Sequence, residues 1–119
     1  VYKRQRQPFN VNSLAMIAAQ AALGDERFLA ESIAVNAAGM QQLIAGLDDM
    51  GLHFIPSRGN FIAVNLQQPG AVVYQKLLHE GVIVRPVDNY GMPDCLRVSI
   101  GLEDENARFL LALAKVLDR

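Results

Sequence analysis

The strongest constraint on the fold is a long run of helical periodicity in the first half of the chain. Its apolar residues recur mostly at intervals of three, four or seven positions: Leu29, Ile33, Met40, Leu43, Ile44 and Leu47. This spacing predicts one α-helix with a single apolar face, capped at Asp25 and stopped at Gly51. Gly39 and Gly46 lie inside the run, and we predict that they mark close packing against another element. A helix of this kind must bury its face against a second layer.

The periodicity changes from helix to strand after this run. A short helix with Ser13 as its N-cap is predicted before it, ending near Gly24. Strands are predicted at 52–55, 61–66, 82–87 and 95–100, a turn at 56–59, a loop at 88–94, and helices at 72–78 and from 103 onward. The last helix is predicted to bury Ala107, Leu110, Leu111, Ala114 and Leu117. The order ααββαββα predicts an α+β domain with a small, largely antiparallel sheet covered by helices.

The length of 119 residues suits one compact domain. We predict an extended inter-domain segment at residues 1–12 and a single small domain at 13–119. The first residues are basic, lack an initiator methionine and lack the apolar core of a signal peptide. We therefore expect the chain to begin within a longer protein, with another domain covering one of its faces.

Charge and cysteine content exclude several classes of function. The formal net charge of −1 argues against binding to nucleic acid or to an anionic membrane. No uninterrupted apolar stretch is long enough to predict a membrane span. The single cysteine, Cys95, excludes an intrachain disulfide and suits a reducing cytoplasm.

Common catalytic motifs are absent from the sequence. There is no glycine-rich phosphate loop, nucleophile elbow or cysteine pair. His53 and His79 are isolated and predicted to be structural, and Cys95 is predicted to be a buried thiol. The acidic run at 103–105 is interpreted as a helix start, so no metal site is predicted.

Two arginines within predicted strands are the more informative residues. Period two places Ile83, Arg85 and Val87 on one face of the strand at 82–87. A guanidinium between two branched apolar side chains is unusual for a surface exposed only to water.

The second arginine, Arg97, belongs to the strand at 95–100. It shares a face with Cys95 and Ser99, whose small side chains leave a guanidinium room to bind an anion with its planar fork. Two readings stay open from the pattern alone: structural ion pairs with carboxylates such as Asp88 or Asp94, or a shared anion site formed by Arg85 and Arg97.

Four further residues are weaker candidates. Asn10 and Asn12 suit a turn or a helix cap, and Asn60 belongs to a predicted hairpin turn, Arg58-Gly59-Asn60. Tyr90 could line a site, but packing over its own loop is favoured.

Several motifs together resemble the histidinol-phosphate aminotransferases, which are pyridoxal-phosphate enzymes of fold type I. They are Arg6-Gln7-Pro8-Phe9-Asn10-Val11-Asn12-Ser13, Pro56-Ser57-Arg58-Gly59-Asn60-Phe61, Arg85-Pro86-Val87 with Asn89-Tyr90-Gly91, Leu96-Arg97-Val98-Ser99-Ile100-Gly101 and Glu105-Asn106-Ala107-Arg108-Phe109-Leu110. The resemblance extends from about residue 4 to residue 118, and the order and spacing of the motifs make it specific. It implies the C-terminal small domain of such an enzyme, in which Arg97 binds the acidic end of the substrate and Arg85 is a second anion contact.

The same resemblance implies what the chain lacks. In the family, the Schiff-base lysine and the phosphate cup of pyridoxal 5'-phosphate belong to the large domain. Lys3, Lys76 and Lys115 do not stand in the family's Ser-Lys context. We therefore expect no catalytic residue, no cofactor-binding residue and no bound cofactor in this chain, and no activity from it alone.

The resemblance also implies the reaction and the partners. The complete protein would be a cytoplasmic homodimer that converts histidinol phosphate and 2-oxoglutarate into imidazole-acetol phosphate and glutamate, in histidine biosynthesis. The partners would be its own large domain and a small phosphate or carboxylate substrate. Three alternatives stay open: a fragment of an aromatic amino acid aminotransferase, a stand-alone anion-binding regulatory module, and a structural domain whose arginines form salt bridges.

Overall fold

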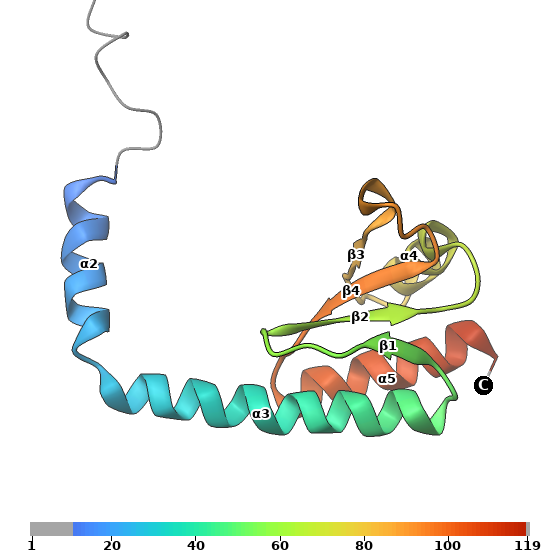
Figure 1. Ribbon diagram of the computed structural model, residues 1–119, viewed down its shortest axis with the longest axis horizontal. Coiled ribbons are helices and arrows are strands. Elements are labelled where there is room, and N and C mark those ends of the chain that lie inside the picture. Colours follow the sequence, from blue (N-terminus) through green and yellow to red (C-terminus); the bar gives the residue numbers. More distant parts are fainter. Residues whose placement is uncertain (1–10, 119) are drawn as a thin grey trace, which may run out of the picture. The chain divides into compact units, whose positions relative to one another are not determined.

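The computed structural model describes residues 11–118, which fall into two compact units that divide after Ser32. The elements, drawn in Figure 1, are α2 (Ser13–Leu23), α3 (Glu26–Asp49), β1 (His53–Ile55), β2 (Phe61–Asn65), α4 (Gly70–His79), β3 (Arg85–Pro86), the short 3₁₀ turn η1 (Asp88–Tyr90), β4 (Cys95–Ser99) and α5 (Glu103–Leu117). This order confirms the predicted ααββαββα arrangement. The predictions for Lys3, Asn10 and most of the segment 1–12 lie outside the described residues.

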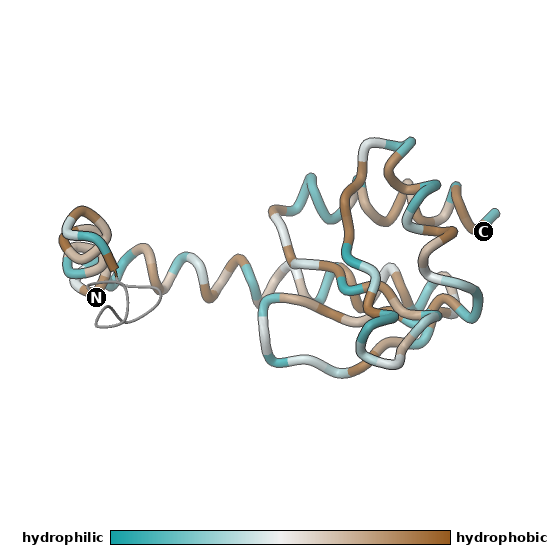
Figure 2. Tube along the Cα trace, turned by 90° about the horizontal axis from the view of Figure 1, so that it is seen from above, coloured by the Kyte–Doolittle hydropathy of each residue, from teal (hydrophilic) through white to brown (hydrophobic). Residues whose placement is uncertain are grey.

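The first unit is helical, and α2 has no buried residue. Asn12 is its N-cap, because the Asn12 side chain accepts a hydrogen bond from the Ala15 N–H at 2.8 Å. The prediction of Ser13 as the cap was wrong by one position. Asp25 caps the start of α3 as predicted, accepting from the Phe28 N–H at 3.0 Å. Apolar residues recur along α2 and the first turns of α3 (Figure 2), and Leu14, Ile17 and Leu23 are all exposed.

The second unit is an antiparallel sheet with helices packed on one face. The strand order is β1-β2-β4-β3, and every neighbouring pair is antiparallel. Within this unit α3 and α5 lie side by side beneath the sheet (Figure 1). The core combines helix and strand residues that are almost fully buried: Leu43, Leu47, Ile62, Val64, Val73, Leu77, Leu96 and Leu113.

Two glycines of α3 explain how closely its neighbours approach. A Cβ at Gly39 would lie 2.6 Å from Ile100 Cγ2, and a Cβ at Gly46 would lie 2.5 Å from Leu110 Cδ1. Both distances are shorter than van der Waals contact, so the predicted close-packing role of these glycines is confirmed. Leu29 and Ile33 belong to the same predicted apolar face of the helix, but they are 60% and 61% exposed.

The buried face of α5 differs from the predicted one. The buried residues are Asn106, Phe109, Ala112 and Leu113, whereas the predicted Leu111 is 74% exposed. Ala107, Leu110, Ala114 and Leu117 are only partly buried. Relative to the predicted orientation, α5 is turned so that Asn106 faces inward. Asn106 is held to the chain just before the helix: its Oδ1 accepts from the Gly101 N–H and its Nδ2 donates to the Gly101 carbonyl, both at 3.0 Å.

The predicted strand at 82–87 is reduced to Arg85 and Pro86. Gly81 has a φ of +75° and ends α4, where the Val82 N–H donates to the Leu77 carbonyl at 2.9 Å. This bond ties Val82 to the helix end rather than to the sheet. Pro86 has no N–H to extend the pairing. Val87 is consequently buried while Ile83 is 82% exposed, so these two residues do not share a face as predicted.

Candidate functional site

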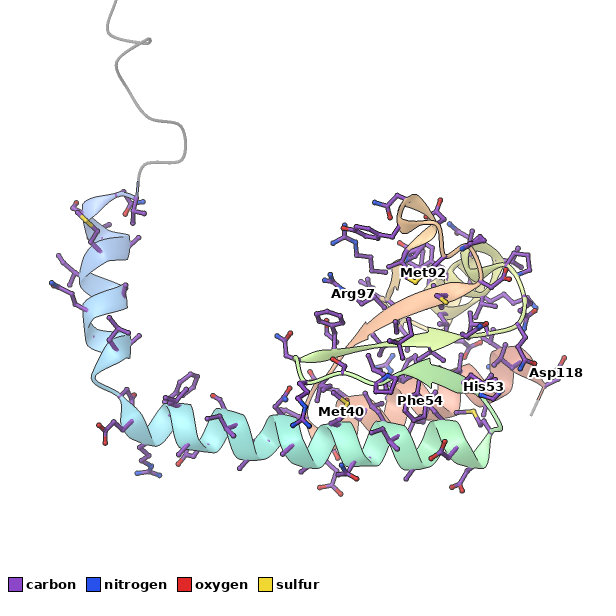
Figure 3. All side chains as sticks on the ribbon, in the orientation of Figure 1. Met40, His53, Phe54, Met92, Arg97 and Asp118 are labelled. Carbon is purple, nitrogen blue, oxygen red and sulfur yellow. The ribbon has the colours of Figure 1, made fainter. Side chains whose placement is uncertain are left out.

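The two faces of the sheet have opposite character. Along β2 and β4 the buried residues Ile62, Val64, Leu96 and Val98 alternate with residues of the other face. Arg97 therefore lies on the side of the sheet away from Met40 of α3 (Figure 3). We call this side the open face; it is defined by Ile55, Phe61, Ala63, Asn65, Arg85, Cys95, Arg97 and Ser99.

Arg85 and Arg97 are brought together by strand pairing. They are direct Cα partners in the β3–β4 ladder, so both side chains leave the same face of the sheet. Arg85 is exposed and Arg97 is half-buried. Like charges directly opposite each other destabilise a sheet unless an anion screens them.

No carboxylate neutralises this pair within residues 11–118. The ion pairs there join Arg27 to Glu31 and Lys115 to Glu80, each at 2.8 Å. The structural ion pairs with Asp88 or Asp94 that the sequence allowed are therefore not formed in the described chain. The two guanidiniums keep their N–H groups available, and this arrangement can bind an anion with several charge-assisted hydrogen bonds.

Arg97 has one close neighbour that the sequence reasoning missed. Its Cζ lies 4.8 Å from the centroid of the Phe61 ring. Phe61 pairs with Ser99, and Ala63 pairs with Arg97, so the ring reaches the guanidinium diagonally across the ladder. Alternation within the strand at 61–66 could have placed Phe61 and Ala63 on one face, but only the pairing of β2 with β4 makes them neighbours of Arg97.

The weaker sequence candidates have mostly local roles. Asn12 caps α2, and the Asn60 carbonyl accepts from the Ile100 N–H at 2.9 Å, closing the sheet beside the predicted turn. Tyr90 is 61% exposed, so its own loop covers only a minor part of its side chain.

The remaining polar candidates do not form a second site. His79 Nδ1 lies 2.7 Å from the Gln75 carbonyl within α4. Cys95 is buried as predicted, and burial, followed by the nearby Asp94 charge, raises the pKa of its thiol. Within the described chain no cluster of His, Cys, Asp and Glu could hold a metal ion. The acidic run starts α5, where Glu105 Oε2 accepts from the Leu102 N–H at 2.8 Å.

The described lysines lie away from the open face. Lys76 is in the last turn of α4 and Lys115 in the last turn of α5, and both helices contribute to the core on the opposite side of the sheet. Lys115 Nζ is paired with Glu80 Oε2 at 2.8 Å. Residues 11–118 therefore offer no lysine beside the two arginines, and they do not by themselves fit a Schiff-base cofactor.

Membrane insertion finds no support in the described part of the chain. None of its helices combines the length and hydrophobicity that a bilayer span requires.

Comparison with known proteins gives one consistent family. Residues 1–113 match the family model for aminotransferases of class I and II. The chain is 66% identical over 119 residues to histidinol-phosphate aminotransferase 2 of Pseudomonas fluorescens, covering all of this chain and 32% of that protein. It is 62% identical over 117 residues to histidinol-phosphate aminotransferase 2 of Pseudomonas aeruginosa, covering 98% of this chain and again 32% of the relative. The chain thus spans about a third of the length of the curated relatives it matches.

Solved structures agree with the sequence comparison. The histidinol-phosphate aminotransferase of Clostridium acetobutylicum superposes with a TM-score of 0.85 at 27% identity, over 98% of this chain and 36% of that one. The enzyme from Sinorhizobium meliloti, solved in complex with pyridoxal-5'-phosphate, gives a TM-score of 0.84 at 26% identity, over 98% of this chain and 33% of that one.

Proposed function

This chain belongs to the class I and II aminotransferase family, and we propose that it carries the substrate-anion part of a histidinol-phosphate aminotransferase. The family is pyridoxal-phosphate dependent. The proposed reaction of the complete protein converts histidinol phosphate and 2-oxoglutarate into imidazole-acetol phosphate and glutamate. The observation that carries the proposal is the direct pairing of Arg85 with Arg97 on an open face, without a carboxylate partner in the described chain.

Arg97 is the proposed principal anion contact and Arg85 the second. A phosphate ester carries about −1.5 to −2 charges at neutral pH and offers three acceptor oxygens. Two guanidiniums on one face match that charge and geometry better than they match a single carboxylate. This comparison favours histidinol phosphate over an aromatic amino acid, whose only acidic group is its carboxylate.

The two arginines would also orient the substrate. An anion held at one end by several hydrogen bonds restricts the position of the rest of the molecule, which lowers the entropic cost of the reaction. Closure of this domain over the rest of the protein would exclude water from the site. The chemistry itself is assigned to residues outside this chain, since the described lysines do not face the arginines.

The partner proposed for this chain is the remaining two thirds of the same protein. Two exposed surfaces are the proposed contacts with that partner: the open face, and the apolar surface of α2, which includes Leu14, Ile17 and Leu23. A helix that is apolar on most of its surface is ordinarily buried. We propose that residues 13–119 act as the small domain of a cytoplasmic homodimer, and that the cofactor lysine belongs to the large domain.

Substitution of Arg97 in the complete enzyme tests the proposal. Arg97→Ala is expected to raise the KM for histidinol phosphate about 10- to 100-fold, because a hydrogen-bonded charge contact is lost, while the cofactor stays bound. Arg108→Ala, which removes an exposed guanidinium from α5 on the other side of the sheet, is the matched control. Unchanged kinetics for Arg97→Ala would reject the anion role.

A second measurement tests whether this chain acts without the rest. After the 119-residue chain is mixed with pyridoxal phosphate and reduced with borohydride, no lysine is expected to be labelled stoichiometrically. Stoichiometric labelling of Lys3, Lys76 or Lys115, found by peptide mass spectrometry, would contradict the assignment of the cofactor site to the large domain. Phosphate binding without any transaminase activity in the complete protein would instead favour a stand-alone anion-sensing module.

A further inference from the structure

The ring of Phe61 is an unusual neighbour for a ligand-binding arginine. Phe61 opens β2 and is 38% exposed, so it is not a member of the core formed with the helices. One side of the ring faces the β1–β2 turn, where a Cβ at Gly59 would lie 3.6 Å from its Cε1 atom. The ring is also approached by the Arg97 guanidinium, with Cζ 4.8 Å from the centroid.

The strand register makes room for this contact. Ala63 lies directly opposite Arg97 in the β2–β4 ladder, and its side chain is a single methyl group, too short to displace the guanidinium. Arg85 occupies the position opposite Arg97 in the β3–β4 ladder, where it repels the guanidinium. Arg97 therefore has a repulsive neighbour on one strand and an attractive aromatic face on the other.

An aromatic ring and a carboxylate both attract a guanidinium, but only the ring leaves the guanidinium N–H groups available for a ligand. A carboxylate neutralises a guanidinium and occupies its N–H groups through a bidentate pair. An aromatic face attracts the cation through the ring quadrupole and accepts no conventional hydrogen bond at the guanidinium edge. Within the described chain Arg97 has the ring contact and no ion pair.

We propose that Phe61 is a positioning residue: its ring holds the Arg97 guanidinium apart from Arg85 while leaving the N–H groups of Arg97 available to the substrate anion. The inference rests on the proposed function of Arg97 as an anion contact and adds a residue to that site. Phe61 acts through Arg97 and does not need to touch the anion itself.

The test uses the full 119-residue chain with inorganic phosphate as the probe. In the wild type, ring currents of Phe61 are expected to shift the Arg97 side-chain protons upfield in NMR spectra, and added phosphate is expected to perturb the Arg97 Nε–Hε resonance. Phe61→Leu is expected to abolish the upfield shift and to weaken phosphate binding about two- to fivefold, as expected for loss of an exposed cation–π contact. Phe61→Tyr, which keeps the aromatic face, is expected to restore both.

Phe54→Leu is the matched control, because it removes an aromatic ring from β1 that packs against the core on the other side of the sheet. It is expected to lower stability while leaving the Arg97 resonances and the phosphate affinity unchanged. Equal phosphate binding by wild type and Phe61→Leu would overturn the positioning role of Phe61 and leave the anion site itself intact. Absence of phosphate binding by the wild type would overturn the anion site as well as the role given to the ring.

Discussion

The two faces of the sheet belong to the same strands, but one is apolar and buried whereas the other carries exposed charge. On the helix side, Ile62, Val64, Leu96 and Val98 are almost fully buried and stabilise the domain. On the open face, two arginines stand side by side and their repulsion opposes folding. The free energy of folding therefore comes mainly from the helix side, while the open face keeps the arginine pair to which we assign anion binding, at some cost in stability.

The largest effect is expected from a cavity on the helix side. Leu96 is 1% exposed, so Leu96→Ala should lower the free energy of unfolding by about 2–5 kcal/mol through lost burial and an unfilled cavity. Ile55→Ala on the open face, where Ile55 is 50% exposed, should cost about 0.5 kcal/mol or less. Urea denaturation of both variants measures the contrast, and equal losses would show that the open face also carries core stability.

Overpacking on the helix side should have the next largest effect. Gly39→Ala places a methyl group against Ile100 and against Asn106, whose amide is fixed by two hydrogen bonds. We expect a loss of about 1–3 kcal/mol. Gly46→Ala places its methyl group against the end of the Leu110 side chain, which can shift by rotation, so the gain in helix propensity of about 1 kcal/mol offsets a larger share of its cost. The midpoint temperature of thermal unfolding should be lower for Gly39→Ala than for Gly46→Ala. The reverse order would contradict the anchoring of Asn106 by its two hydrogen bonds.

Charge reversal on the open face should separate stability from binding. Arg85→Glu replaces the repulsive cross-strand pair by an attractive one, so the free energy of unfolding should rise by about 0.2–1 kcal/mol. The same change should abolish phosphate binding by the chain, as followed by NMR titration. Arg58→Glu, at an exposed position of the β1–β2 turn, controls for the altered net charge. Loss of stability in Arg85→Glu would mean that the arginine pair supports the fold.

The smallest effect concerns Cys95, which is buried although it shares the open face with Arg97. Because burial raises the pKa of the folded thiol, the folded state retains its proton at pH values where the unfolded thiol has lost it. The stabilising contribution is complete below the ordinary thiol pKa and declines as pH rises above it. The stability of wild type should therefore fall more steeply at alkaline pH than that of Cys95→Ala, and parallel curves would argue against a protonated buried thiol.

Local sequence patterns predicted most of the elements. Asp25 as a cap, the close approach at Gly39 and Gly46, and the strand at Cys95–Ser99 agree with expectation because each depends on nearby residues or on backbone shape. The strand at 82–87 was overestimated, since β-branched residues favour a strand but Val82 is bound to the end of α4. The rotation of α5 was missed because the Asn106 anchor is a polar contact that hydrophobic spacing does not reveal.

The sequence by itself determined the order of helices and strands, the resemblance to the aminotransferases, and the choice of Arg85 and Arg97 as candidates. Only the tertiary structure decided that these arginines are direct partners across β3 and β4, and that Phe61 lies beside Arg97. Strand pairing joins residues distant in the chain, and a shift of one position would send every side chain to the other face. That register depends on the packing of the whole sheet against its helices, so no single segment of the sequence specifies it.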